Sequence, residues 1–352
     1  MTPVPSLDQR GRARLADMYG RYRALAEDPE GSRPMIVIST PAADLPRWEE
    51  RLADPQVMLE AELAELRPHL EMEDDRVTSV RIEFGTAQVA AAFGCSMYVP
   101  DNNVPCAGSR AMARAEDVFG ASLPGTDAGW YARAWEWTQR WRRALPDWIL
   151  FDLPDIQSAF NSAHLIRGND ILTDFYDAPS AVERLLDLVT DFMIAVVQRA
   201  RAVAGGDPAW FTDWGSLWKG RARISNCSMH MISPDFYRRF VLPRDTRFLR
   251  SVGGGRVHYC GSHPDVIAHF YRIPMLSGLD FDWNIHDMRL VDEAPPHVVI
   301  ASTLPLAPGS PVLEGMLAGR WPRKRNIIVH ASAPSVREGK DLLSRLRTAA
   351  GY

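Results

Sequence analysis

His258 and Cys260 are the residues whose types and spacing point most directly to chemistry. They stand in the short run 257–260 (VHYC), which has the character of a β-strand. Because successive strand side chains point to opposite faces, residues two apart share a face and can bind one metal ion. Imidazole together with thiolate suits Zn²⁺. The alternative is a packed core histidine beside a buried cysteine, which is common for such a pair.

The surrounding residues place this pair at the end of a strand. Gly261 follows Cys260 at once, and residues 264–271 have a helical pattern. Parallel α/β folds keep their catalytic residues at the C-terminal ends of strands, so we expect a functional site here. The glycines at 253–255 precede a strand instead of linking a strand to a helix, which disfavours a phosphate-binding loop.

Four acidic residues are further candidates. Glu83 near the end of a predicted strand is a possible catalytic general acid or additional metal contact, or else the ion-pair partner of an arginine. Asp213, which lies between two tryptophans, is a second catalytic candidate that could line the pocket, or else a loop cap. Asp280 and Asp282 follow a predicted strand and could hold His258 in place, or cap a helix.

The other cysteines and histidines carry a weaker signal. Cys227 and His230 stand in NCSMHM, a spacing compatible with one helical face or one strand end, but we do not favour metal binding there. His263 and His269 fall in a helical segment and are expected at the surface. Cys95 and Cys106 are expected to be structural.

The elements that must position these residues alternate along the chain. Eight segments have strand character: 34–39, 77–84, 148–152, 210–214, 257–260, 275–281, 298–303 and 326–331. Helical segments separate them, the clearest running from Val182 to Val197 and ending at Gly205-Gly206. No linker interrupts the series. We predict an α/β protein with a single (β/α)₈ TIM-barrel domain over residues 1–352, of which residues 1–75 form a mostly helical N-terminal part.

Composition restricts the class of function. The chain has 352 residues, 46% of them hydrophobic, and a formal net charge of −4. No Lys/Arg run is present, which argues against nucleic acid or an anionic membrane as the main partner. Four scattered cysteines are too few for a disulfide framework. With no apolar signal core near the N-terminus, we expect a cytoplasmic protein.

An ordered set of segments over residues 78–350 resembles the uroporphyrinogen decarboxylase superfamily, which also contains cobalamin-dependent methyltransferases. The segments are VRIEFGTAQVAAAFGC, DILTDFYDAPSAVERLLDLVTDFM, ISPDFYRRFVLPRDTRFLRSVGGGRVHYCG, IPMLSGLDF and NIIVHASAPSVREGKDLL. The superfamily shares its barrel with cobalamin-independent methionine synthase. The set as a whole is specific, whereas each piece alone is weak.

Two features indicate which branch of the superfamily the chain resembles. Residues 1–50 lack the arginine motif, with RQAGR at its centre, that grips substrate carboxylates in true uroporphyrinogen decarboxylases. The methyltransferase branch carries His-x-Cys at the position of His258 and Cys260, where it binds zinc. Those relatives complete the site with a C-terminal cysteine, and here the corresponding strand ends in His330, an equally good zinc ligand. The resemblance therefore implies a zinc site of His258, Cys260 and His330.

The activity implied is transfer of a methyl group between a small substrate, such as a methoxylated aromatic compound or methanol, and a corrinoid (cobalamin) carried on a partner protein. Zinc would make a thiolate or polarise a leaving oxygen. Two alternatives stay open. One is a metal-free decarboxylase or lyase in which Asp and Arg residues handle a polycarboxylate. The other is a non-catalytic barrel that binds a corrinoid or tetrapyrrole.

Overall fold

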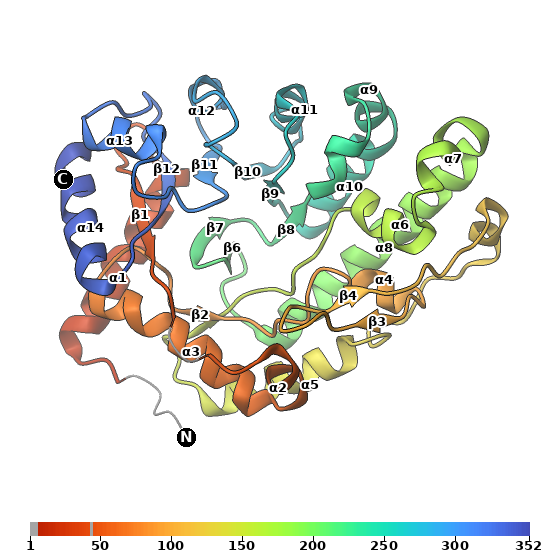
Figure 1. Cartoon of the computed structure of the whole chain (residues 1–352), viewed down its shortest axis with the longest axis horizontal. Coiled ribbons are helices and arrows are strands. Elements are labelled where there is room, and N and C mark those ends of the chain that lie inside the picture. Colours follow the sequence, from red (N-terminus) through yellow and green to blue (C-terminus); the bar gives the residue numbers. More distant parts are fainter. Residues whose placement is uncertain (1–5, 43–44) are drawn as a thin grey trace.

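The central element of the fold is a parallel β-sheet. The computed structural model describes residues 6–42 and 45–352. Six strands run in the order β1-β12-β11-β10-β9-β8, and every neighbouring pair is parallel. Their bounds are β1 Met35–Ser39, β8 Ala222–Ser225, β9 Gly255–Tyr259, β10 Leu276–Phe281, β11 Val299–Ser302 and β12 Ile327–Ser332. In Figure 1 the strands follow one another along an arc, with connecting helices outside it.

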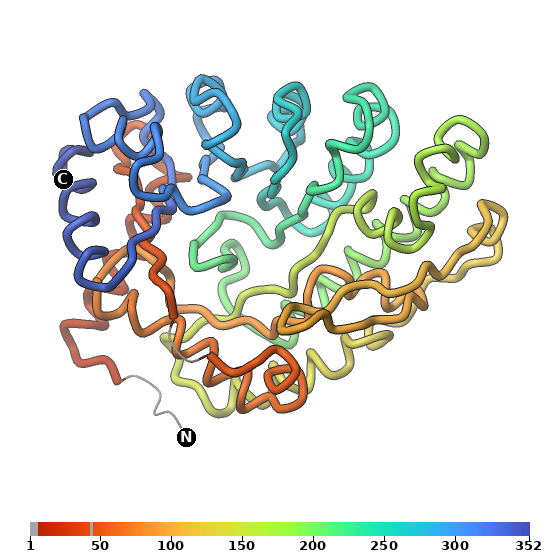
Figure 2. The backbone as a smooth tube through the Cα atoms, viewed as in Figure 1, coloured from red at the N-terminus to blue at the C-terminus, as the bar shows by residue number. Residues whose placement is uncertain are grey.

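The sequence of these strands explains their burial. β8, β9 and β11 are buried at every position, and β1 at all but its last residue. Strands covered on both faces read as continuous runs of buried residues, without the alternation of a half-exposed sheet. The tube in Figure 2 passes from red to blue around the arc once, and brings β1 beside β12, with Val37 opposite His330.

Two shorter parallel strands continue the wall. β2 (Ser79–Val80) pairs with β5 (Leu150–Phe151), and a parallel bridge between Gln157 and Ser225 joins the chain after β5 to β8.

Side chains tie the β2 segment to β1. Oδ2 of Asp75 accepts a hydrogen bond from the backbone N–H of Ile36, and Oδ2 of Asp74 accepts one from Ile38, both over 2.8 Å. Both aspartates are buried. The two carboxylates thus satisfy strand amides that lack a backbone partner in this direction.

An antiparallel hairpin lies inside the arc. β6 (Trp210–Asp213) and β7 (Ser216–Lys219) are joined by two residues, Trp214 and Gly215, with φ of 51° and 69°. Positive φ at both central positions is the geometry of a type I′ turn, which matches the twist of the flanking strands. Figures 1 and 2 show the hairpin within the curve of the outer strands.

Close packing holds the hairpin against the sheet. Trp218 of β7 is 2% exposed, and the Arg256 guanidinium lies 4.6 Å from its ring centroid. A Cβ at Gly278 of β10 would stand only 2.4 Å from the Trp218 ring, so the absence of a side chain there permits the contact.

Helices cover the outside of the strands. The α-helices are α1 Gln9–Glu27, α2 Trp48–Ala53, α3 Pro55–Met72, α4 Gln88–Ala92, α5 Tyr131–Ala144, α6 Ala159–Arg167, α7 Ile171–Asp177, α8 Pro179–Ala204, α9 Pro234–Phe236, α10 Leu242–Val252, α11 Pro264–Phe270, α12 Arg289–Asp292, α13 Pro311–Leu317 and α14 Val336–Ala350. Short 3₁₀ or π segments are η1 Ala115–Gly120, η2 Cys227–Met231 and η3 Tyr237–Val241, and a small hairpin pairs β3 Met97–Tyr98 with β4 Cys106–Ala107.

The predicted α/β barrel class is confirmed. The longest predicted helix is α8, which ends at Gly205 with φ of 72°. The prediction differs at the fourth strand, because the expected strand at 210–214 becomes the hairpin, and β8, which was not anticipated, pairs with β9 in the main sheet. Within the described residues, no helix combines the length and apolarity needed to cross a membrane.

Candidate active site

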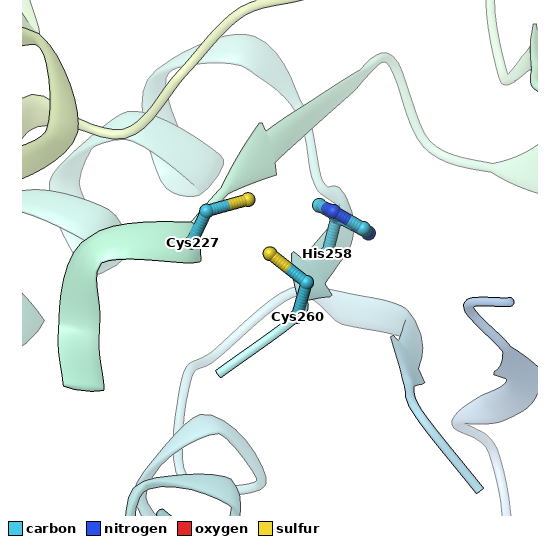
Figure 3. A group of neighbouring side chains, drawn as sticks. All are labelled: Cys227, His258 and Cys260. Atoms are coloured by element: carbon cyan, nitrogen blue, oxygen red, sulfur yellow. The ribbon is translucent and has the colours of Figure 1, made fainter. Parts of the chain in front are cut away.

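Cys227, His258 and Cys260 form a compact group of metal-binding side chains. One ligand atom from each lies within 4.8 Å of the others. Figure 3 shows both sulfur atoms directed into the space between the three side chains. Cys227 begins η2, His258 is in β9, and Cys260 follows β9 directly.

Strand register brings the three residues together. Ser225 of β8 is paired with His258 of β9, and the backbone N–H of Asn226 donates to the His258 carbonyl over 2.8 Å. Continuing this register two residues further sets Cys227 opposite Cys260. Because side chains two apart on a strand share a face, both thiols lie on the side that His258 occupies.

Asp280 fixes the His258 ring. Nδ1 of His258 donates to Oδ2 of Asp280 over 2.6 Å, which leaves Nε2 as the nitrogen for a metal ion. Burial alone would lower the pKa of His258, but the Asp280 charge and hydrogen bond outweigh it and raise the pKa. Arg256 and His258 overcome the effect of burial on Asp280 and hold its pKa well below the usual value. Thr303 Oγ1 donates to the same carboxylate over 2.9 Å.

The two thiols have different environments. A hydrogen bond from Cys227 is the main cause that lowers the pKa of Cys260 to about 5, and His258 adds to it. The same interaction raises the pKa of Cys227. Cys260 is exposed, Cys227 is half-buried and His258 is buried. One thiolate-forming cysteine, a second thiol and an oriented imidazole are a donor set that fits zinc, and the exposed side leaves room for a substrate.

A buried ionic network supports the site from below. Asp213 is 3% exposed and forms ion pairs with Arg256 and Arg223. Arg223 also pairs with Asp155 over 2.5 Å. The attraction of Arg223 and Arg256 outweighs burial and keeps the pKa of Asp213 low. The catalytic role predicted for Asp213 therefore stays a prediction, and its contacts are those of a positioning residue at the base of the Trp214 turn.

A polar pocket of about 340 Å³ opens beside the metal-binding group. Residues at or just beyond the ends of five strands line it: Ser39, Arg81, Asp152, Thr303 and, in the last strand, His330. Trp214 also lines it and packs against His258, with ring centroids 5.6 Å apart. This indole therefore stands between the pocket and the metal-binding group.

Glu83 lines the same pocket. It pairs with Arg81, and its Oε1 accepts a hydrogen bond from the Gly85 N–H over 2.8 Å. It is not a member of the Cys227 group. The ion-pair alternative thus describes its contacts, and a catalytic role for Glu83 stays a prediction.

The metal-binding role predicted for His330 stays a prediction. The residue lines the pocket but lies outside the compact group, in which Cys227 takes the third place. Burial lowers the pKa of His330 to about 4, so the ring is neutral at neutral pH, and its Nε2 has no hydrogen-bond partner among the described residues.

Cys227 is the residue for which sequence reasoning disfavoured metal binding. The signal that could have identified it is the pairing of β8 with β9, which no local pattern shows. Its neighbour in the motif, His230, is exposed and its Nδ1 contacts the Cys227 carbonyl. Asp280 takes the role of holding His258, whereas Asp282 caps the following turn by accepting from the Asn284 N–H.

The remaining cysteines and histidines lie away from the group: Cys95, Cys106, His263 and His269. A larger cavity of about 560 Å³ lies between the ends of α5, α8 and the hairpin, and contains none of the candidate site residues.

Fold and site together define the class of protein, an α/β barrel with its polar site at the C-terminal ends of the strands, where enzymes of this architecture react their substrates. Residues 44–301 match the uroporphyrinogen decarboxylase (URO-D) family, and the chain belongs to that family.

One similar solved structure is a methyltransferase from Methanosarcina mazei. It aligns with a TM-score of 0.67 over 95% of this chain and 98% of that chain, at 17% sequence identity. At this identity the likeness shows the fold. Comparison with curated protein sequences gave no match.

Proposed function

We propose that this protein is a zinc-dependent methyltransferase that moves a methyl group between a small substrate and a corrinoid carried on a partner protein. The observation that carries the proposal is the convergence of Cys227, His258 and Cys260 within 4.8 Å, with Asp280 on the far nitrogen of the imidazole. The fold shared with a methanogen methyltransferase supports it.

Cys227, His258 and Cys260 would hold the zinc, with Cys227 in place of the predicted His330. When bound, the ion would act as a Lewis acid toward a substrate sulfur or oxygen. Asp280 keeps the His258 ring in one orientation and one tautomer. Trp214 closes one side of the group and so limits access to the exposed side of Cys260.

Two measurements test the proposal. Elemental analysis is expected to find zinc bound by the native chain and absent from a Cys227→Ser/Cys260→Ser double variant. Incubation with cob(I)alamin and methyl donors such as methanol or methoxylated benzoates is expected to give methylcobalamin. A protein that never holds zinc and transfers no methyl group would contradict the proposal.

The metal-free decarboxylase is the alternative within the same family. Two arginines next to the site, Arg223 and Arg256, are both paired with buried aspartates and are not free to hold a polycarboxylate. Conversion of uroporphyrinogen to coproporphyrinogen by the purified protein would favour this alternative.

A further inference from the structure

Arg76 is a cation of the polar pocket that has no ion-pair partner among the described residues. Its side chain lines the cavity beside the metal-binding group, and its Nε is buried without a hydrogen-bond partner. Within residues 6–42 and 45–352, no carboxylate lies within 4.0 Å of its guanidinium. Arg76 is half-buried, and a partly buried guanidinium whose Nε has no partner is a position at which an anionic ligand could supply the missing acceptor.

Four further polar atoms without a hydrogen-bond partner among the described residues belong to side chains that line the same cavity. They are Nη1 of Arg81, Oδ1 of Asp152, Oγ of Ser79, a residue that is 3% exposed, and Nε2 of His330. Arg76 and His330 line the same cavity, and the charge of Arg76 adds to the effect of burial in lowering the pKa of His330. A guanidinium, a hydroxyl and an imidazole nitrogen together are donors suited to the oxygens of an anionic group.

The other two arginines of the pocket have carboxylate partners. Arg81 pairs with Glu83, and Arg51 lies 3.8 Å from Glu65. The two remaining carboxyls that line the pocket, Glu62 and Asp152, form no ion pair with Arg76. Among the described residues, Arg76 is therefore the arginine of this pocket that lacks a carboxylate partner, which matches a ligand with a negative charge.

The pocket leads to the metal-binding group by two contacts. Trp214 lines the pocket and packs on His258. Thr303 lines it as well and donates to Asp280, the residue that holds His258. The cavity of about 340 Å³ has room for a small aromatic or aliphatic molecule, as ligand sites of this size do.

We infer that the pocket binds a small anionic substrate, such as a carboxylate, through Arg76, Ser79 and His330, with its opposite end directed past Trp214 toward Cys227, His258 and Cys260. The statement that the bound molecule is a substrate rests on the proposed function. The anion site itself is independent of methyl transfer.

Calorimetric titration with para-methoxybenzoate and its neutral analogue para-methoxybenzamide tests the charge requirement. Acetate and benzoate extend the series to smaller monoanions. The carboxylates are expected to bind, and para-methoxybenzoate to bind about tenfold to a hundredfold more tightly than the amide, as for a hydrogen-bonded charge pair. Equal binding of acid and amide, or no saturable binding of any carboxylate, would overturn the inference.

Variants locate the site. Arg76→Met retains a long side chain and removes the charge, and it is expected to weaken carboxylate binding by about tenfold to a hundredfold while the amide is unaffected. Arg238→Gln, which removes an exposed arginine paired with Asp235, is the matched control and should bind as the native protein does. Zinc content and the thermal transition should stay unchanged in both variants.

The outcomes separate the two proposals. If carboxylate binding depends on Arg76 but the protein neither holds zinc nor transfers a methyl group, the proposed function is contradicted and the anion site is supported. Methyl transfer by a protein in which Arg76→Met binds carboxylates as tightly as the native chain would remove the anion site and leave the proposed function.

Discussion

Asp280 accepts a 2.6 Å hydrogen bond from Nδ1 of His258, and the carboxylate that does so also pairs with Arg256. Arg256 holds the Asp280 carboxylate in place, and that carboxylate in turn holds the His258 ring. Since the Nδ1 hydrogen bond sets which nitrogen is free, this pair determines that His258 presents Nε2 to the space it shares with Cys227 and Cys260.

The first prediction concerns this pair. Asp280→Asn is expected to lower zinc affinity by about tenfold to a hundredfold, because the imidazole loses the acceptor that orients it. Competition with a chromogenic chelator measures the change. Thr303→Val, which removes only a hydroxyl donor to the same carboxylate, is the control and should change affinity much less. Unchanged affinity in Asp280→Asn would leave the hydrogen bond a purely structural contact.

The second prediction distinguishes the third metal ligand. Cys227→Ser and Cys260→Ser are each expected to lose bound zinc and remain folded, since a barrel core does not depend on a metal. His330→Ala should keep it, because His330 lies outside the group. Cys106→Ser is the control. Zinc loss from His330→Ala with retention in Cys227→Ser, read by elemental analysis, would restore the ligand set inferred from the resemblance.

The third prediction concerns pH and Asp245. This residue is 1% exposed and accepts hydrogen bonds from Asn226 and Tyr237, and burial raises its pKa from 3.8 to about 7. The folded state therefore keeps a proton that the unfolded chain releases near pH 3.8. The stability that this proton provides is full below pH 3.8, declines as pH rises toward 7, and is lost above it.

Asp245→Asn should remove that decline. As pH rises from 4 to 7, the free energy of unfolding of the variant is expected to increase relative to that of the native protein by on the order of 4 kcal/mol. Urea unfolding across this pH range measures the difference. Asp235→Asn, an exposed position, should follow the native profile. Parallel profiles for native and Asp245→Asn would show that Asp245 is ionised in the fold.

The fourth prediction tests the hairpin contact. Gly278→Ala places a methyl group 2.4 Å from the Trp218 ring, and we expect a loss of about 1–3 kcal/mol of stability from overpacking. Gly20→Ala in α1, where no atom lies within 4 Å of the added carbon, should instead gain about 0.5–1 kcal/mol. Chemical denaturation compares the two. Equal effects would mean that the sheet moves aside for the hairpin.

The sequence was sufficient for those features that depend on local pattern. Alternation set His258 and Cys260 on one face, and the series of apolar segments indicated the barrel. Cys227 was not identified because its place depends on the pairing of β8 with β9. β8 was itself missed because Arg223 stands in it, and that arginine is buried only because Asp155 and Asp213 neutralise it. A charge pair between distant segments leaves no periodic signal.

The hairpin escaped prediction for a related reason. Type I′ turns favour Asn, Asp or Gly, whereas this one has Trp214 at φ of 51°. Such a conformation is unfavourable for a bulky residue and persists only where the surroundings impose it. Here Arg81 and Arg223 lie 5.7 and 5.2 Å from the indole centroid. Those contacts are tertiary and cannot be deduced from local preferences.

The junction of β1 with the segment before β2 is more sensitive to mutation than the other strand pairs. Elsewhere in the wall, adjacent strands are joined by main-chain groups that every amino acid except proline supplies, so mutation of a side chain seldom erases the joint. At this junction one main-chain bond runs from the Asp75 N–H to the Ile36 carbonyl, and the side chains of Asp74 and Asp75 provide the acceptors for the N–H groups of Ile38 and Ile36. A single amino-acid substitution at either position can therefore delete a hydrogen bond that holds this segment to β1. This part of the wall thus depends on the identity of two side chains.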